Sequence, residues 1–285
     1  MCRLFAMSAG PERARASFWL LDAPDSLTAQ SRRMPDGTGL GWFDEQGLPT
    51  ISKQPIAAYE DREFARRAHE VASRTFVAHV RFASTGELTL QNTHPFEQAG
   101  RLFAHNGVIE DLPALERRAG PAMTLVQGET DSERLFALIT HETAERGGDL
   151  AAGIAAACQW VAANLPILSI NFVLATADEV WALRYPEHHE LYVLEREPGE
   201  PIAHDSTIGT RVRSEHCASL PTVTIASEPM DDEATWRLLD PGELIRVTPE
   251  PAVTSHRVLD GPPAHPLALA DLGARARASQ AKQPS

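Results

Sequence analysis

Short runs of apolar residues recur along most of this chain, and their length and spacing predict strands. One run, residues 3–9, begins directly behind the first two residues, and residues 76–80 and 102–105 form two more. The second half of the chain continues in the same way. Its strand-like runs are residues 169–176, 180–185, 191–194, 223–226 and 244–247.

Three other stretches place apolar residues at helical spacing. Residues 61–72 carry them on one stripe, and residues 130–133 read Thr-Asp-Ser-Glu, the form of a capping box that opens a helix. The Ala-rich residues 150–165 predict a further helix. Strands thus come first, two helices follow, and strands return. This order favours two sheets packed together with helices outside over a repeating parallel βα fold.

Residues 35–42 alternate three glycines with other residues, a pattern that suits a chain bending to let another group approach its backbone. We expect a loop here. The segment lacks the Lys-Ser/Thr ending of a phosphate-binding loop and the glycine spacing of a dinucleotide-binding fold. It therefore does not predict a nucleotide site.

Composition favours one domain followed by a tail. Of the 285 residues 43% are hydrophobic, which is enough for a sizeable core, and no composition break appears before about Asp260. We therefore expect one domain over residues 2–260. The Pro- and Ala-rich residues 261–285 have weak periodicity and predict a largely disordered tail.

The net charge of −13 excludes two classes of partner. Because no basic excess exists to neutralise phosphates, we expect neither nucleic acid nor an anionic membrane surface as a partner. No apolar run approaches the ~20 residues that span a bilayer, and no signal-peptide core follows the first charge. The three cysteines, at positions 2, 158 and 217, are too few and too scattered for a disulfide framework or a zinc site. The sequence thus predicts a cytoplasmic protein without a metal.

The position of Cys2 suggests a chemistry. Methionine aminopeptidase removes Met1 when the next residue is small, and the mature chain would then carry a thiol and a free α-amine on Cys2. The ordinary pKa of an α-amine is about 7.7–8.0 and that of a thiol about 8.5, so the amine can take the thiol proton near neutral pH. Many chains begin Met-Cys by chance, so the rest of the chain has to supply the other parts of an amide-cleaving site.

Two basic residues are candidates for substrate contact. Arg81 ends a predicted strand, where its guanidinium can bind a carboxylate through two hydrogen bonds or pair with an internal Asp or Glu. His94, in Asn-Thr-His-Pro-Phe, either contacts substrate or orders the turn, and both interpretations stay open. His79, inside the strand of Arg81, is interpreted as a core histidine.

Asn106 and Gly107 end another predicted strand. Asn-Gly normally indicates a hairpin or loop, but the Asn106 amide and the Gly107 N–H also suit an oxyanion hole. Losing one donor of such a hole typically costs ~3–4 kcal/mol of transition-state stabilisation. Asp131 stands in the first turn of the helix that Thr130 caps and Glu133 closes, where it is free to bind an α-ammonium group.

Taken in order, these segments resemble the class II glutamine amidotransferase family. The matching pieces are Met-Cys at the start, Ala-His-Val-Arg-Phe-Ala-Ser-Thr, Asn-Thr-His-Pro-Phe, Ala-His-Asn-Gly and Glu-Thr-Asp-Ser-Glu, and they extend over about residues 2–248. The resemblance implies an α+β fold, the four-layer αββα sandwich of N-terminal-nucleophile hydrolases. The chain is most similar to the small stand-alone members, which include predicted amidotransferases and the γ-glutamyl hydrolase of ergothioneine biosynthesis.

The resemblance also implies a role for each candidate. Cys2 is the nucleophile, Asn106 with Gly107 forms the oxyanion hole, and Arg81 and Asp131 hold the α-carboxylate and α-amine of the substrate.

Ser84 takes the position where the family often has a substrate-contacting Thr, and His94 is a further substrate contact. Phe82 and Thr85 depart from the Trp and His of the sugar-phosphate amidotransferases.

The expected function is cleavage of the γ-amide of glutamine or of a γ-glutamyl small molecule through a thioester, with no cofactor. One alternative is an ammonia-supplying subunit for a separate synthase partner. Another is a binding module without catalysis, which needs neither Cys2 nor the oxyanion-type Asn106.

Overall fold

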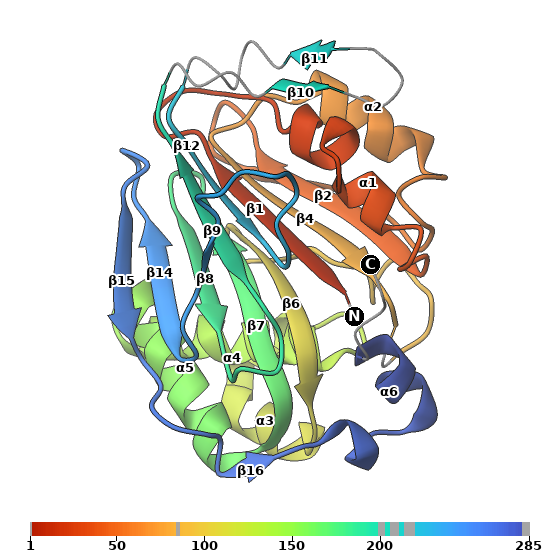
Figure 1. The fold of residues 1–285 in the computed structure, drawn as a ribbon. Coiled ribbons are helices and arrows are strands. Elements are labelled where there is room, and N and C mark those ends of the chain that lie inside the picture. The colour runs from red at the N-terminus through yellow and green to blue at the C-terminus, as the bar shows by residue number, and fades with distance from the viewer. Residues whose placement is uncertain (1, 84–85, 199–202, 206–210, 214–219, 281–285) are drawn as a thin grey trace.

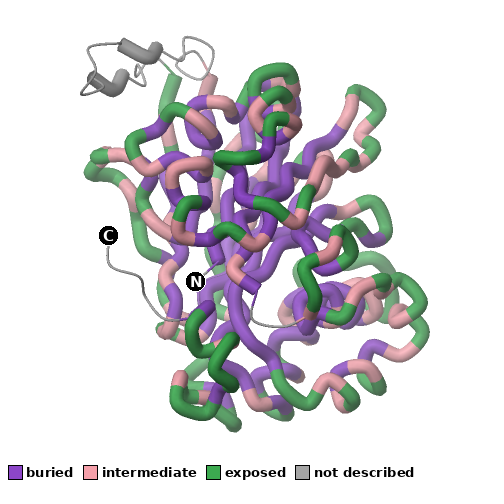
Figure 2. The backbone as a smooth tube through the Cα atoms, turned by 90° about the vertical axis from the view of Figure 1, so that its right-hand side faces the viewer, coloured by how far each residue is buried: buried purple, intermediate pink, exposed green. Residues whose placement is uncertain are grey.

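The computed structural model describes residues 2–83, 86–198, 203–205, 211–213 and 220–280. Their elements form four layers, in which two β-sheets pack face to face and helices cover both outer faces (Figure 1). This is an α+β sandwich of the αββα type, as the sequence predicts. Buried residues follow the strands through the middle of the molecule, and most connecting turns are exposed (Figure 2).

The first sheet is built around the first strand of the chain. Its order in the described residues is β13 (Arg237–Leu238), β9 (Tyr192–Arg196), β12 (Thr222–Ala226), β1 (Arg3–Ser8), β4 (Thr75–Arg81), β2 (Gly37–Phe43) and β3 (Pro49–Gln54). β1 is central and pairs antiparallel with both β12 and β4. Its register sets Arg3 opposite Val80, and this places Cys2 beside the end of β4, where Arg81 stands.

The three alternating glycines lie in β2, so the expectation of a loop over residues 35–42 is wrong. They share one face of the strand, because residues two apart in a strand point the same way. A Cβ on Gly39 would stand 2.1 Å from the His94 carbonyl oxygen, and one on Gly41 would stand 2.9 Å from Leu102 Cδ1. The glycines therefore serve close packing between segments and not a bend.

The second sheet carries the longest strands. Its members among the described residues are β15 (Val253–Arg257), β14 (Glu243–Val247), β8 (Val180–Arg184), β7 (Pro166–Ala175), β6 (Arg101–Ile109) and β5 (Phe96–Gln98), in that order, with β16 (His265–Pro266) paired to β7. These pairs are antiparallel except that of β16 with β7, which is parallel.

Helices cover the outer face of each sheet. Over the first sheet lie η1 (Phe18–Asp22), α1 (Leu27–Gln30) and α2 (Arg62–Glu70), and over the second lie α3 (Leu112–Ala119), η2 (Gly120–Leu125), α4 (Asp131–Glu145) and α5 (Leu150–Asn164). The predicted helices at residues 61–72 and 150–165 are confirmed. Among the helices of the described residues, none has the length and apolar character to cross a membrane.

The capping box at the start of α4 forms only in part. Thr130 accepts a hydrogen bond from the Glu133 backbone N–H at 3.2 Å, as expected of a cap. The Glu133 carboxylate does not close the box. It accepts hydrogen bonds from the backbone N–H groups of Gln127 and Gly128, at 3.0 and 2.7 Å, and so holds the loop before the helix.

The segment after residue 260 holds β16, η3 (Leu269–Asp271) and α6 (Ala274–Gln280). Leu272, between the last two, packs against Val108 of β6 and Leu168 of β7. Arg275 of α6 lies near enough to Arg81, at the end of β4, for its charge to lower the pKa of that guanidinium, and Figure 1 draws α6 below the N-terminal end of the chain. The division into a domain and a tail stays a prediction. A separate two-stranded sheet joins β10 (Ala203–Asp205) and β11 (Arg211–Arg213).

Candidate active site

Cys2 stands at the end of the sandwich where β1 begins. It is 8% exposed. Its Sγ lies 3.3 Å from both the backbone nitrogen and the carbonyl oxygen of Phe82, the residue directly after β4. The N–H of Phe82 donates to the sulfur, so the thiol is held against the end of the neighbouring strand.

Burial is the main influence on the Cys2 thiol, and it raises the pKa of that thiol above its ordinary value. The Phe82 N–H, the charge of the chain's N-terminus and the guanidinium groups of Arg81 and Arg3 act in the opposite direction and lower the same pKa. At neutral pH the resting sulfur therefore keeps its proton, and a nearby base has to remove it before the sulfur can attack.

A partly buried ion pair fixes the backbone next to Cys2. Arg3 donates to both carboxylate oxygens of Glu228, at 2.8 and 2.9 Å. Arg33, from the loop before β2, donates to the same carboxylate at 3.0 Å. The loops that carry Arg33 and Glu228 are thus tied to the start of β1, directly after Cys2. Removing one partner of such a pair leaves a charge uncompensated.

Asn106 and Gly107 lie within β6 and not at its end, so the hairpin alternative is wrong. The Asn106 Nδ2 donates to the backbone carbonyl of Cys2 at 3.1 Å, and its Oδ1 is buried without a hydrogen-bond partner among the described residues. A Cβ on Gly107 would stand 1.8 Å from the Ser169 carbonyl oxygen, which only glycine permits.

Arg81 and Asp131 approach the same pocket from different layers. The Arg81 side chain is buried at the end of β4 and donates to the Glu87 carbonyl at 3.2 Å. Asp131, at the start of α4, accepts from the Ile109 N–H at 2.9 Å and, through its other oxygen, from the Ser132 N–H at 2.9 Å. Backbone donors therefore orient the carboxylate, whereas the sequence had suggested an Asp131 without such contacts, free to bind a cationic group.

Two histidines of the pocket are kept neutral. Burial is the largest cause that lowers the pKa of His94 and of His105 below the ordinary value. The His94 ring packs between His79, in a tilted contact, and Phe96, edge to face, with centroid distances of 4.2 and 4.5 Å. His105 Nδ1 lies 2.9 Å from Ser132 Oγ, which lies 3.4 Å from Asp131 Oδ1.

The structure brings most of the candidates together. One narrow pocket is lined by Cys2, Arg81, Phe82, His94, His105, Gly107, Thr130, Asp131 and Ser132. Asn106 reaches its edge through the hydrogen bond to Cys2. Ser84 lies outside the described residues. The role of each residue in the pocket stays a prediction.

Sequence reasoning missed Ser132 and His105 as pocket residues. Each is adjacent in sequence to a predicted site residue, since His105 precedes Asn106 and Ser132 follows Asp131. The sequence alone does not show that β6 and α4 face each other here. Among the described residues, no group of three or more His, Cys, Asp or Glu side chains is arranged to hold a metal ion.

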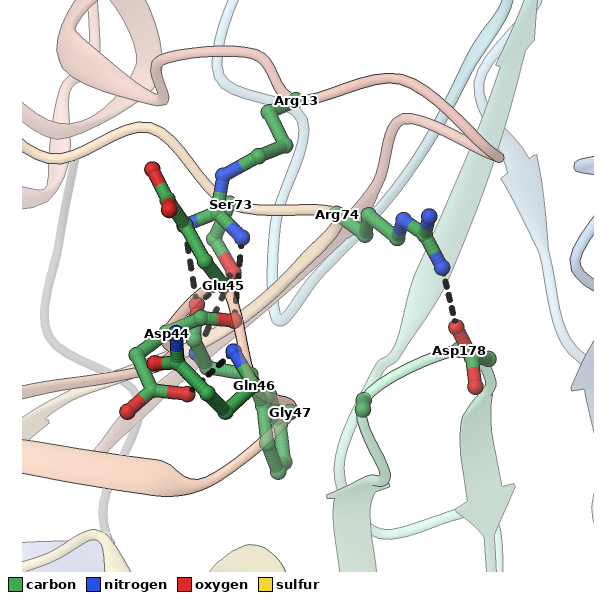
Figure 3. Close-up of a pocket in the computed structure, with 10 residues that line it drawn as sticks. Arg13, Asp44, Glu45, Gln46, Gly47, Ser73, Arg74 and Asp178 are labelled. Atoms are coloured by element: carbon green, nitrogen blue, oxygen red, sulfur yellow. Dashed lines mark hydrogen bonds and ion pairs between the residues drawn. The ribbon is translucent and has the colours of Figure 1, made fainter.

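A larger pocket, of about 440 Å³, lies at the opposite end of β4 (Figure 3). Both of its arginines already have partners. Arg13 donates to the backbone carbonyls of Phe43, Asp44 and Ala72, and Arg74 pairs with Asp178 at 2.8 Å. These contacts close the turns at that end of the sandwich and give no indication of a ligand.

Comparison with known proteins connects this geometry to a family. A family model described as "Glutamine amidotransferases class-II" matches residues 1–258. The chain is 28% identical over 253 residues to a protein of Escherichia coli named "Putative glutamine amidotransferase YafJ", covering 85% of this chain and 96% of that protein. It is 27% identical over 239 residues to the "Gamma-glutamyl-hercynylcysteine sulfoxide hydrolase" of Mycobacterium tuberculosis, covering 80% of this chain and 86% of that one.

Solved structures agree on the fold. A predicted glutamine amidotransferase from Pseudomonas aeruginosa superposes with a TM-score of 0.61 at 22% identity, covering 88% of this chain and 99% of that chain. The glutamine phosphoribosylpyrophosphate amidotransferase of Bacillus subtilis superposes with a TM-score of 0.63 at 19% identity, covering 92% of this chain and 50% of that chain.

Proposed function

The chain belongs to the class II glutamine amidotransferases, and on this premise we propose that it hydrolyses the γ-amide of glutamine or of a γ-glutamyl compound through a thioester on Cys2. The observation that carries the proposal is the meeting of four elements in one pocket. The start of β1 brings Cys2, the end of β4 brings Arg81, β6 brings Gly107 and the start of α4 brings Asp131.

The first step is removal of the thiol proton. After loss of Met1, the α-amine of Cys2 is the nearest base that the chain itself supplies, and it is neutral in part at physiological pH. It takes the proton, directly or through a water molecule. The thiolate then attacks the γ-carbonyl carbon, a C–S bond forms, and negative charge develops on the carbonyl oxygen.

Asn106 and Gly107 stabilise that oxyanion in the proposal. Nδ2 of Asn106 carries two hydrogens, and the hydrogen bond to the Cys2 carbonyl uses one of them. The second hydrogen and the Gly107 N–H are the two donors. Because the pocket is buried, each donor stabilises developing charge more strongly than it would in water.

The protonated amine then donates its proton to the leaving nitrogen, and the C–N bond breaks. Ammonia or a larger amine leaves, and the γ-glutamyl group stays on Cys2 as a thioester. A water molecule, deprotonated by the same amine, attacks the thioester and releases glutamate and the thiol. Arg81 and Asp131 hold the substrate α-carboxylate and α-ammonium throughout, by charge-assisted hydrogen bonds. We place this chemistry in the cytoplasm, where a thiol stays reduced.

Intact-mass spectrometry with 6-diazo-5-oxo-L-norleucine, a glutamine-shaped electrophile, tests the proposal. We expect purified protein to lack Met1 and to gain one stoichiometric adduct that maps to Cys2. Cys2→Ser protein is the control and should gain none. Retention of Met1, or an adduct elsewhere, contradicts the mechanism.

Ammonia supply to a separate synthase is the second candidate, because the family includes chains in which a glutamine site serves a second activity. It predicts slow hydrolysis of glutamine by the chain alone and a rise when the synthase is added. Fast turnover by the isolated chain favours independent hydrolysis.

A further inference from the structure

A half-buried lysine on the edge of the first sheet reaches the turn that carries His94. Lys53, in β3, donates through Nζ to the carbonyl oxygens of Thr93 and Pro95, at 2.6 and 3.2 Å. These two carbonyls flank His94 on either side. We propose that Lys53 is a positioning residue, which holds the backbone of His94 so that the imidazole faces the γ-glutamyl substrate.

The neighbouring strand β2 also packs against the turn at residues 93–95. Gly39 of β2 pairs with Lys53 across the sheet, and the His94 carbonyl oxygen occupies the space where a side chain of residue 39 would begin. Three successive carbonyls, of Thr93, His94 and Pro95, therefore rest against β2 and β3. The lysine holds the outer two, and the missing side chain of Gly39 admits the middle one.

The position of the His94 ring depends on this backbone packing, because no hydrogen bond among the described residues holds the ring. Both of its ring nitrogens are buried and have no hydrogen-bond partner among the described residues. The ring is oriented by its tilted contact with His79, its edge-to-face contact with Phe96 and its own backbone. His94 lines the pocket that Cys2 also lines, and in the proposal its unpartnered nitrogens are the polar atoms that meet the substrate.

The positive charge of Lys53 strengthens its hold on the turn at residues 93–95. Its Nζ also lies 5.1 Å from the centroid of the Phe96 ring, the same ring that packs against His94. Burial lowers the pKa of Lys53 to about 8, and Glu133 of α4 acts in the opposite direction. The positive charge of Lys53 in turn lowers the pKa of His94. Above about pH 8 the Lys53 amine becomes neutral. A neutral donor binds carbonyls more weakly than a charged one.

Three variants test the inference, which rests on the proposed function. Lys53→Met removes the donors and keeps the apolar stem, and Lys53→Arg restores a permanent charge. Arg74→Gln, which removes one exposed cation at the opposite end of β4, is the matched control. For glutamine hydrolysis we expect Lys53→Met to raise KM about tenfold with kcat changed less than about threefold, the loss typical of one charged hydrogen bond. Lys53→Arg should recover most of the KM, and Arg74→Gln should match the wild type.

The pH profile separates positioning from general support of the fold. In wild type kcat/KM should fall above about pH 8, as Lys53 loses its charge. In Lys53→Arg that fall should move to higher pH, because a guanidinium stays charged. Two results overturn the inference. One is an equal fall of kcat/KM in Lys53→Met, Lys53→Arg and Arg74→Gln. The other is a Lys53→Arg profile whose alkaline limb stays at the pH of the wild type.

A spectroscopic readout keeps the inference testable if the chain does not turn over glutamine. The imidazole resonances of His94, assigned with a His94→Gln variant, should shift in Lys53→Met and stay in place in Arg74→Gln. Unchanged resonances would show that Lys53 does not position the ring. A shift without any reaction of Cys2 with the norleucine reagent would instead sustain the positioning and refute the proposed function.

Discussion

The side-chain amide of Asn106 donates a hydrogen bond to the backbone carbonyl of Cys2, and the Nδ2–O distance is 3.1 Å. The bond crosses from the second sheet to the first, so one residue of β6 fixes the backbone of the nucleophile. The same residue is a proposed donor to the oxyanion. A change at position 106 therefore acts on both the thiol and the charge that it creates.

We expect Asn106→Ala to lower kcat by about 10²–10³, the usual effect of removing one oxyanion donor. Binding of substrate should change far less, because the proposed mechanism assigns it to Arg81 and Asp131. Steady-state hydrolysis of glutamine measures both constants. Asn164→Ala is the control, since the Asn164 side chain donates within α5, to the Trp160 carbonyl, and does not line the pocket. A kcat within threefold of wild type would remove Asn106 from the oxyanion hole.

Gly107→Ala should destabilise the fold as well as the site. The added Cβ would meet the carbonyl group of Ser169, a backbone atom of β7 that cannot rotate away. Overpacking of this kind costs typically about 1–3 kcal/mol. Urea unfolding measures the loss. Gly273→Ala, where a Cβ meets nothing within 4 Å, is the control and should be neutral. Equal stability of both variants contradicts the expected clash.

Cys2→Ser should separate binding from chemistry. Serine is also small, so Met1 is still removed, and the pocket keeps its shape. The hydroxyl is a far weaker nucleophile than the thiol, so we expect kcat to fall by about 10³ or more. Calorimetric binding of glutamine should remain within about threefold of the wild type. A serine variant that turns over at the wild-type rate would exclude the thioester.

Asp25 makes stability depend on pH. Burial is the largest cause that raises the pKa of Asp25 to about 6, and the neighbouring Glu228 carboxylate raises it further, while Arg33 lowers it. The folded state therefore holds the Asp25 proton more tightly than the unfolded chain does. The stability that this proton contributes is complete below about pH 4 and is lost as the pH rises through about 6.

Asp25→Asn removes this dependence. The melting temperature of the variant should gain on that of the wild type as the pH is raised from about 4 to 7, and thermal melts across this range measure the difference. A difference that stays constant with pH, or that shrinks as the pH rises, would mean that Asp25 titrates as an ordinary carboxyl group.

The family resemblance predicted the fold class, and local pattern predicted most of the strands and the helix that supply the pocket. Local pattern alone predicts strands at residues 3–9 and 76–80 and a helix start at residues 130–133. Ordered motifs separated by more than a hundred residues then indicate one pocket, although their contacts are not local.

Contacts between layers could not be predicted in the same way. The glycines of β2 look like a turn signal until the carbonyl of His94 is seen beside Gly39. Lys53 belongs to no motif, and its function appears only when the turn at residues 93–95 lies over β3. Glu133 fits a capping box by spacing, yet the loop before the helix competes for its carboxylate. For Gly39 and Lys53 the deciding partner is distant in sequence, and for Glu133 it is a backbone conformation that spacing does not show.

The position of α6 limits how this protein can be handled. Leu272 packs on Val108, the residue after Gly107, and Arg275 of α6 lies near enough to Arg81 to influence its pKa, so a purification handle joined to α6 would be anchored near the pocket. A handle before Cys2 would block its amine. The exposed turn at Gly147 and Gly148 is a better place, because α4 begins at Asp131 in the pocket and carries the chain about 20 Å away before the turn. An affinity tag or fluorophore inserted there leaves both ends of the chain as they are.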